Sequence, residues 1–105
     1  MAANLTRMRT WLDALLEQRS LGTDDARELL VGLTDEQLPP ALSGALLAAI
    51  RAKGVTAEEL RGFALGMRAL ARRPLTPRGL DAVDIVGTGG DKSGSFNIST
   101  GSSLL

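Results

Sequence analysis

Apolar side chains recur at helical spacing along most of the first 73 residues. Over residues 5–16, leucine and methionine positions three or four apart alternate with charged ones. They predict a first amphipathic helix, for which Gly22 offers a stop. A second apolar stripe has two aspartates in its first turn, where the helix dipole favours negative charge. It predicts a short helix that is capped by Thr23 and ends near Thr34.

Two prolines divide the next stretch of the chain. Thr34 and Gln37 have the spacing of a capping box, and the Pro-Pro pair at 39–40 excludes a regular helix interior at that point. We therefore expect one turn before the prolines and a longer helix over residues 40–53. Gly54 follows this helix at the position where a left-handed residue commonly ends one.

A fourth helix has the clearest signals. Thr56 and Glu59 form a capping box immediately before an apolar run. The run follows i, i+3, i+4, i+7 spacing and consists of Leu60, Phe63, Ala64, Met67, Leu70 and Ala71. The helix is expected to stop before Pro74. Residues 1–73 are thus predicted to form a helical N-terminal domain, and residues 74–81, with two prolines and a glycine, a linker.

The pattern changes after the linker. Residues 82–86 form a short apolar run that predicts a β-strand, and a glycine-rich loop and a hydroxyl-rich helix start follow it. One strand alone leaves its backbone groups unpaired, and the last residues fall within the first turns of the expected helix. We therefore predict an α/β protein. A small all-helical N-terminal domain precedes the first strand, the loop and the helix start of an incomplete α/β domain over residues 82–105.

Composition narrows the chemistry. The chain has 12 basic and 12 acidic residues, so no global field draws it to nucleic acid or to an anionic membrane. Cysteine, histidine and tyrosine are absent, which excludes disulfides, thiol catalysis and metal sites built from thiolate or imidazole. No apolar run approaches the length of a membrane span, and the N-terminus lacks a signal pattern. We expect a soluble cytoplasmic protein without nucleic-acid or membrane partners.

The glycine-rich loop is the candidate binding site. Gly87, Gly89, Gly90 and Gly94 permit positive φ angles and let backbone N–H groups approach a ligand. The helix start after them leaves N–H donors unpaired at the positive end of a dipole. This combination favours an anion, above all phosphate. The common motifs do not fit, since Lys92 stands where the dinucleotide pattern needs its third glycine and the P-loop glycine before the lysine is missing.

Two segments of this stretch resemble one enzyme family. Residues 84–91 read Asp-Ile-Val-Gly-Thr-Gly-Gly-Asp, and residues 95–100 read Ser-Phe-Asn-Ile-Ser-Thr. Together they are similar to the phosphoribosyl-diphosphate loop of the anthranilate phosphoribosyltransferase family. Upstream, Ala-Lys-Gly at 52–54 with Thr56 and Glu-Glu-Leu at 58–60 resembles that family's helical N-terminal domain. The resemblance covers most of the chain, and its loop portion is the specific part.

The resemblance implies transfer of a ribose 5-phosphate group from phosphoribosyl diphosphate to the amino nitrogen of anthranilate, with release of pyrophosphate, in tryptophan biosynthesis. It implies contacts to phosphoribosyl diphosphate from Gly87, Gly90, Asp91, Ser95, Asn97, Ile98, Ser99 and Thr100. Gly87 would also border anthranilate, Ser99 would help to hold Mg²⁺, and the helical domain would form a homodimer. No catalytic nucleophile is expected, because a donor-rich, metal-assisted cradle stabilises the charges that develop. The 105 residues alone are expected to be inactive.

Three residues of the loop qualify this interpretation. A carboxylate beside pyrophosphate repels it, so Asp91 is expected to accept hydrogen bonds from ribose hydroxyls, loop N–H groups or magnesium-bound water. Lys92 stands where the family more often has glycine, and it either adds a charge-assisted contact to pyrophosphate or extends into water. Ser95 stands where threonine is common and keeps the hydroxyl.

Two other functions compete with the transferase. A pyrimidine nucleoside phosphorylase of the same fold has its own glycine-rich loop at this place, although the Asn-Ile-Ser-Thr segment at 97–100 argues against it. The second is a helical association module, in which the apolar stripes of the helices are partly buried between subunits. The transferase is the first hypothesis.

Overall fold

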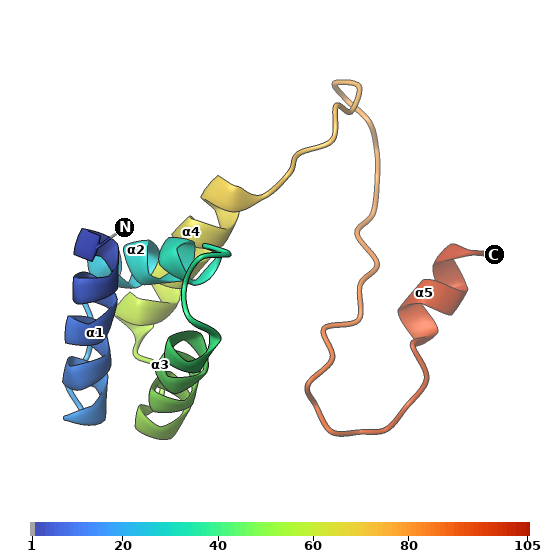
Figure 1. Cartoon of the computed structure of the whole chain (residues 1–105). Coiled ribbons are helices and arrows are strands. Elements are labelled where there is room, and N and C mark those ends of the chain that lie inside the picture. The colour runs from blue at the N-terminus through green and yellow to red at the C-terminus, as the bar shows by residue number, and fades with distance from the viewer. Residues whose placement is uncertain (1) are drawn as a thin grey trace. The chain divides into compact units, whose positions relative to one another are not determined.

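The computed structural model describes residues 2–105. The chain divides into two compact units, with bounds Met1–Arg73 and Pro74–Leu105 (Figure 1). The helices of the first unit are α1 (Ala2–Leu16), α2 (Thr23–Leu33), α3 (Pro40–Lys53) and α4 (Ala57–Leu70), and the second unit holds α5 (Ile98–Ser103). The four helices predicted for the N-terminal part are therefore confirmed. Within the described residues, none of the helices combines the length and the apolar character that a membrane crossing requires.

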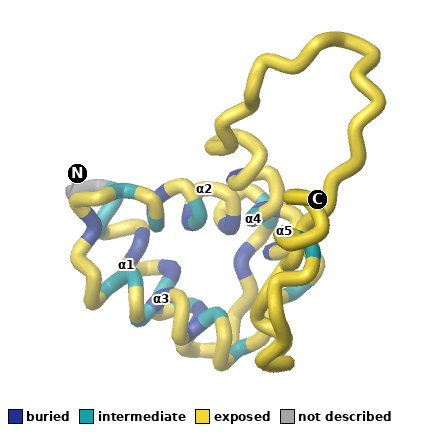
Figure 2. Tube along the Cα trace, turned by 90° about the vertical axis from the view of Figure 1, so that its right-hand side faces the viewer, coloured by how far each residue is buried: buried dark blue, intermediate teal, exposed yellow. Residues whose placement is uncertain are grey.

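The first unit consists of two helix pairs, α1 with α3 and α2 with α4. Its apolar core contains Met8, Trp11, Leu15, Leu21, Ala26, Leu29, Leu38, Leu46 and Ala49. Most of these positions lie on α1, α2 and α3, Leu21 and Leu38 lie in the connections between them, and Figure 2 marks buried positions in dark blue. The buried positions of α4 are of a different kind, because they are one charged residue, Glu59, and two glycines, Gly62 and Gly66. These three residues explain how α4 joins the unit.

The first helix ends differently from the prediction. It stops at Leu16 rather than near Gly22, and Gln18 takes a left-handed φ of 63°. The amide of Gln18 donates to the carbonyl of Leu15 at 3.0 Å, and the amide of Arg19 donates to the carbonyl of Ala14 at 2.9 Å. This pair of hydrogen bonds is a Schellman motif, which satisfies carbonyls at the end of the helix. Sequence reasoning missed it because glutamine, unlike glycine, gives no signal for that position.

The capping groups of α2 also differ from the prediction. The N-cap is Gly22, which has no side chain to cap the helix, and Thr23 is the first helical residue. The expected box between Thr34 and Gln37 does not form. The hydroxyl of Thr34 donates to the carbonyl of Val31 at 2.7 Å, and the amide of Gln37 donates to Asp35 Oδ1 at 2.9 Å. An aspartate turn therefore leads from α2 toward the prolines.

The capping box of α4 is confirmed, and its glutamate reaches well beyond the cap. Thr56 Oγ1 accepts from the amide of Glu59 at 3.2 Å, and Glu59 Oε2 accepts from the amide of Thr56 at 3.0 Å. Glu59 is 0% exposed. Its Oε1 accepts from the amide of Leu21 at 2.9 Å, and Lys53 Nζ donates to Oε2 at 2.9 Å. One buried carboxylate thus joins the α1–α2 connection, the end of α3 and the start of α4.

The partners of Glu59 keep it ionised. Burial raises the pKa of this carboxyl, but the hydrogen bond from Lys53 and those from two backbone amides outweigh burial and hold the pKa below its ordinary value of 4.5. Lys53 is itself nearly buried, and it also donates to the carbonyl of Gly54 at 2.7 Å and to Ser20 Oγ at 3.4 Å. Gly54 ends α3 with a φ of 88°, as predicted for a glycine at this position.

Two glycines let α4 approach α2 closely. A methyl group at Gly62 would press on the carbonyl oxygen of Thr23 and would lie 2.7 Å from Ala26 Cβ and 2.9 Å from the amide nitrogen of Arg27. Most of these atoms belong to the backbone of α2, which cannot move aside as a flexible side chain can. At Gly66 the same group would lie 2.8 Å from Leu30 Cδ2. The spacing of α2 and α4 therefore depends on the absence of side chains at both positions.

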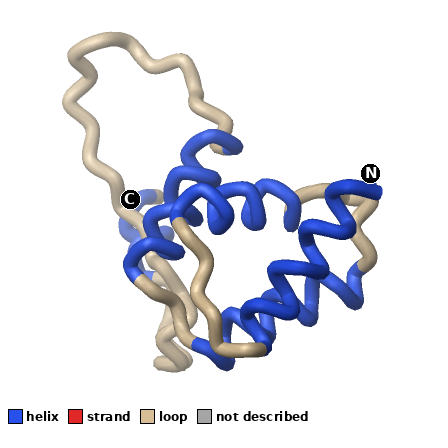
Figure 3. Tube along the Cα trace, turned by 90° about the vertical axis from the view of Figure 1, so that its left-hand side faces the viewer, coloured by secondary structure: helices blue, strands red, loops and turns tan. Residues whose placement is uncertain are grey.

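The second unit contradicts the α/β prediction. Among residues 2–105 the structure has helices and loops but no strand, so the predicted strand at 82–86 and the α/β fold class are wrong (Figure 3). The apolar side chains of this run, including Val83, Ile85 and Val86, are exposed. A strand is stable only when a neighbour completes its hydrogen-bond ladder, and the described residues offer none. The absence of a partner overrides the local preference of the β-branched residues.

The close approach of α4 to α2 gives a first prediction. Gly62→Ala should lower the free energy of unfolding by about 2 kcal/mol, because overpacking against backbone outweighs the gain of about 1 kcal/mol in helix propensity. The control is Gly44→Ala in α3, where nothing lies within 4 Å of the added methyl group. It should raise stability by up to about 1 kcal/mol. Urea unfolding followed by circular dichroism measures both, and a Gly62 variant as stable as the Gly44 variant contradicts the account.

The buried carboxylate gives a second prediction. Glu59→Gln should lower the free energy of unfolding at pH 7 by about 3 kcal/mol, since Lys53 is left buried without its counter-charge. The matched control is Glu58→Gln, which removes an exposed carboxylate from the same helical turn. It should cost less than about 1 kcal/mol.

The effect of Glu59→Gln should also depend on pH in one direction. A carboxyl whose pKa is lower in the folded state stabilises the fold above its ordinary value of 4.5, and this contribution is lost as the pH falls through the folded value. The unfolding free energies of wild type and Glu59→Gln should therefore converge on acidification. A gap between them that stays constant from pH 7 to pH 3 is incompatible with an ionised Glu59.

Candidate functional site

The glycine-rich loop of the second unit curves around a hollow of about 670 Å³. Its lining is the continuous run of residues 86–99. Seven of the eight residues predicted to contact phosphoribosyl diphosphate line it: Gly87, Gly90, Asp91, Ser95, Asn97, Ile98 and Ser99. The eighth, Thr100, does not. The two ends of the run come together, because a methyl group built on Gly87 would lie 3.5 Å from Asn97 Oδ1.

The backbone of the loop is left-handed at several points. Gly89, Gly90 and Gly94 have φ values of 68°, 72° and 65°, which confirms the expected positive φ angles at these three glycines, whereas Gly87 does not have a positive φ. Lys92 also has a positive φ, 58°. Among the described residues, the amides of Gly87, Gly89 and Gly90 find no hydrogen-bond acceptor. These amides are therefore available to an anion that enters the hollow.

Some polar side chains of the loop are already engaged within it. Asp91 Oδ1 accepts from the amide of Ser93 at 3.1 Å. This hydrogen bond and one from the hydroxyl of Ser93 hold the pKa of Asp91 below its ordinary value of 3.8, so Asp91 is ionised at neutral pH. The hydroxyls of Ser93 and Ser95 lie 2.8 Å apart and share a hydrogen bond. Asp91 therefore serves the loop itself, which is one of the three roles expected for it.

The helix after the loop is short. Helix α5 has six residues, and Asn97 is its N-cap, with Oδ1 accepting from the amide of Thr100 at 3.0 Å. The amide of Gly101 donates to the carbonyl of Asn97 at 3.2 Å. Asn97 therefore uses its side-chain Oδ1 to cap the helix, and its side-chain Nδ2 has no hydrogen-bond partner among residues 2–105.

The chain offers little to a metal ion on its own. In the part of the chain that the structure describes, no group of three or more acidic residues is arranged to hold one. Ser99 is half-buried and lines the hollow, and its hydroxyl makes no hydrogen bond to any described residue. Mg²⁺ at phosphate sites takes most of its ligands from phosphate and water. Ser99 thus fits the role of one neutral ligand but cannot form a site alone.

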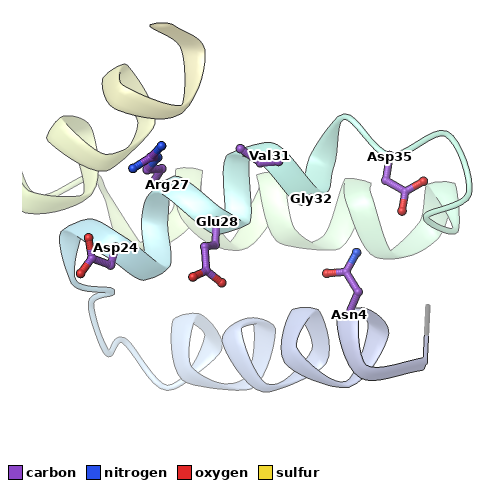
Figure 4. A pocket seen from close by; sticks show the side chains of 7 residues that line it. All are labelled: Asn4, Asp24, Arg27, Glu28, Val31, Gly32 and Asp35. Atoms are coloured by element: carbon purple, nitrogen blue, oxygen red, sulfur yellow. The ribbon is translucent and has the colours of Figure 1, made fainter. Parts of the chain in front are cut away.

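A second hollow, of about 580 Å³, lies in the helical unit and was not predicted (Figure 4). It is lined by Asn4, Asp24, Arg27, Glu28, Val31, Gly32 and Asp35. Glu28 forms an ion pair with Arg7, whose guanidinium also lies 4.0 Å from Asp25 and stacks on Trp11 at 4.9 Å from the ring centre. The acidic residues of α2 at helical spacing are the signal that points to it, and no phosphate-binding pattern occurs there.

Residues 9–71 match the helical bundle domain of the glycosyl transferase family, and the chain belongs to that family. Three of its curated relatives are named anthranilate phosphoribosyltransferase. It is 42% identical to the enzyme of Trichodesmium erythraeum over 97 residues, which cover 85% of this chain and 27% of the relative. It is 44% identical to that of Synechocystis sp. over 105 residues, 92% of this chain and 29% of the relative. It is 42% identical to that of Prochlorococcus marinus over 103 residues, which cover 95% of this chain and 29% of the relative.

These matches bear on the loop as well as on the helices. The family's helical bundle match ends at residue 71, before the loop begins. The Prochlorococcus marinus match leaves out only about one residue in twenty, so most of residues 86–99 lie inside it. The chain spans less than a third of the length of these relatives. No solved structure matches the chain.

The cap of α5 gives a third prediction. Asn97→Ala should unfold this six-residue helix. Loss of an N-cap costs about 1 kcal/mol, and a helix this short is too weakly stable to tolerate that loss. Cα chemical shifts of residues 98–103 measure the effect. Asn97→Asp retains the acceptor oxygen and should keep the helical shifts. Equal shifts in wild type and Asn97→Ala would show that the cap does not hold the helix.

Proposed function

We propose that the chain provides the helical bundle and the phosphoribosyl-diphosphate loop of an anthranilate phosphoribosyltransferase. The observation that carries the proposal is the loop at 86–99, where backbone amides without partners line a hollow and the curated relatives match. The reaction is transfer of the phosphoribosyl group to the amino nitrogen of anthranilate, with release of pyrophosphate, in tryptophan biosynthesis. The cytoplasm is the predicted compartment.

The proposed binding mode follows from the charges of the reaction. When the bond to pyrophosphate breaks, positive charge develops on the ribose carbon and negative charge on the leaving oxygens. Donors fixed in advance around the leaving group stabilise that separation and require no nucleophilic side chain. The free amides of Gly87, Gly89 and Gly90 are such donors, and the hydroxyl of Ser99 and the amide group of Asn97 add short polar groups. Anthranilate is placed beside Gly87.

The remaining predicted contacts keep their proposed roles at the same loop. Asp91 orders the loop through Ser93, and its carboxylate is the proposed acceptor for ribose hydroxyls. Ser95 and Ile98 border the ligand from the hollow, and Thr100 contacts it from the first turn of α5. Mg²⁺ is the proposed metal, with Ser99 as its one ligand from this chain. The metal supplies charge neutralisation of the diphosphate when it is bound.

A homodimer through the helical unit is part of the proposal. Helix α4 exposes Leu60 at 63%, Met67 at 64% and Leu70 at 45%, although its sequence pattern predicted an apolar stripe. Apolar side chains that α4 does not bury within the unit are available to a second copy. Analytical ultracentrifugation of the chain tests this part of the proposal.

The activity itself is tested with a chimaera, because the relatives are more than three times longer than this chain. Residues 1–105 replace the matching segment of the Synechocystis enzyme, and turnover is followed by the loss of anthranilate fluorescence. We predict activity with phosphoribosyl diphosphate and Mg²⁺ and none after chelation of the metal. Gly90→Ala should lower kcat/KM for phosphoribosyl diphosphate about tenfold, since a side chain is strained at a φ of 72°.

The control for Gly90→Ala is again Gly44→Ala, at an open position far along the chain. It should leave kcat/KM unchanged. A chimaera that circular dichroism shows to be folded, but that leaves anthranilate unconsumed at saturating substrate, contradicts the proposed function.

A further inference from the structure

We propose that Lys92 provides the cationic contact of the loop to the diphosphate of the ligand, an inference that rests on the proposed function. The sequence alone left two roles open for this residue, a contact to pyrophosphate or extension into water. Three observations of the loop favour the contact.

The first observation is the charge of the segment. Residues 80–105 contain three aspartates, Asp81, Asp84 and Asp91, and the only basic residue in this range is Lys92. Among the described residues, Lys92 takes part in no ion pair, although Asp91 is its neighbour in sequence. Asp91 is engaged with Ser93 instead. The positive charge of Lys92 is therefore not used within the chain.

The second observation is position. Lys92 belongs to the run that lines the hollow, and it lies two residues after Gly90, whose amide is free like that of Gly89. A ligand held by those amides carries several negative charges and meets the ionised carboxylate of Asp91 in the same loop. Without Lys92 the local charge of the loop is negative and opposes the ligand. With Lys92 the loop is neutral, and the amides act without that repulsion.

The third observation is the backbone. In the described residues only Gln18 and Lys92 have a positive φ without being glycine. Gln18 is explained by the hydrogen bonds that end α1. Lys92 has no such explanation, and a glycine would occupy its φ of 58° without strain. A non-glycine side chain at a backbone position that favours glycine points to a use for the side chain itself.

The test titrates the 105-residue chain with magnesium pyrophosphate and follows the amide NMR signals of residues 87–94. Wild type should show saturable shifts. Lys92→Met and Lys92→Gly should each raise the Kd about fivefold and weaken its dependence on salt, as expected for loss of one charge contact. Lys92→Arg should remain within about twofold of wild type. Arg78→Met removes a positive charge from the same unit outside the loop and should have no effect.

The glycine variant is the decisive one, because it removes the charge and the backbone strain together. If Lys92→Gly binds as tightly as wild type or more tightly, the inference is overturned, since strain and not charge then sets the affinity. Absence of saturable shifts in wild type overturns it as well. The chimaera assay separates these results from the proposed function, because turnover there with an unchanged Kd for Lys92→Gly rejects only the role of Lys92.

Discussion

The helical unit depends on one buried carboxylate. Glu59 is closed off from water and accepts hydrogen bonds from Leu21, Lys53 and Thr56, which come from three separate parts of the chain. Removing an ionised carboxylate from water is costly, and the cost is offset only when charge and hydrogen bonds are supplied together. Lys53 supplies the charge, and Lys53 and the amides of Thr56 and Leu21 supply the hydrogen bonds, which together lower the pKa of Glu59. All four helices of the unit are connected through this residue or through the segments it binds.

The two units treat their backbone groups in opposite ways. In the helical unit, hydrogen bonds from side chains and at helix ends pair the backbone groups. Among the described residues, every buried polar atom of a side chain has a hydrogen-bond partner. In the second unit, glycines hold a loop whose amides remain free. The first arrangement suits a stable scaffold and the second suits a binding site that an anion completes. Family membership rests on the first unit, and the proposed chemistry rests on the second.

Some local signals were predicted correctly from the sequence, others, such as the Thr23 cap and the box between Thr34 and Gln37, were not, and tertiary contacts could not be predicted at all. Helix α3 and the capping box of α4 follow from prolines, glycine and a four-residue motif, all of them short-range. The burial of Glu59 could not be foreseen, because Leu21 lies 38 residues away. Gly62 and Gly66 lower helix propensity and make sense only once α2 lies against them. The strand at 82–86 was predicted wrongly because pairing, not composition, makes a strand.

The candidate loop shows the same division. The glycines of the loop predicted the positive φ angles, and the loop sequence predicted a phosphate ligand. No sequence signal predicts the left-handed backbone of Lys92 or the hydrogen bond from Ser93 to Asp91. The contacts of the eight predicted residues with a ligand stay a prediction. These eight residues lie close together because they are close in sequence. Their proximity was therefore predictable without knowledge of the tertiary structure.

The most direct test of the role of Glu59 is amide hydrogen exchange at Leu21, measured by NMR on the wild-type chain. Leu21 lies in the connection between α1 and α2, outside any helix, and its amide has Glu59 Oε1 as its acceptor. The account predicts that Leu21 exchanges as slowly as the core amide of Leu29 in α2, because both require opening of the unit. Exchange at Leu21 as fast as that of the free loop amides at 87–90 would contradict it.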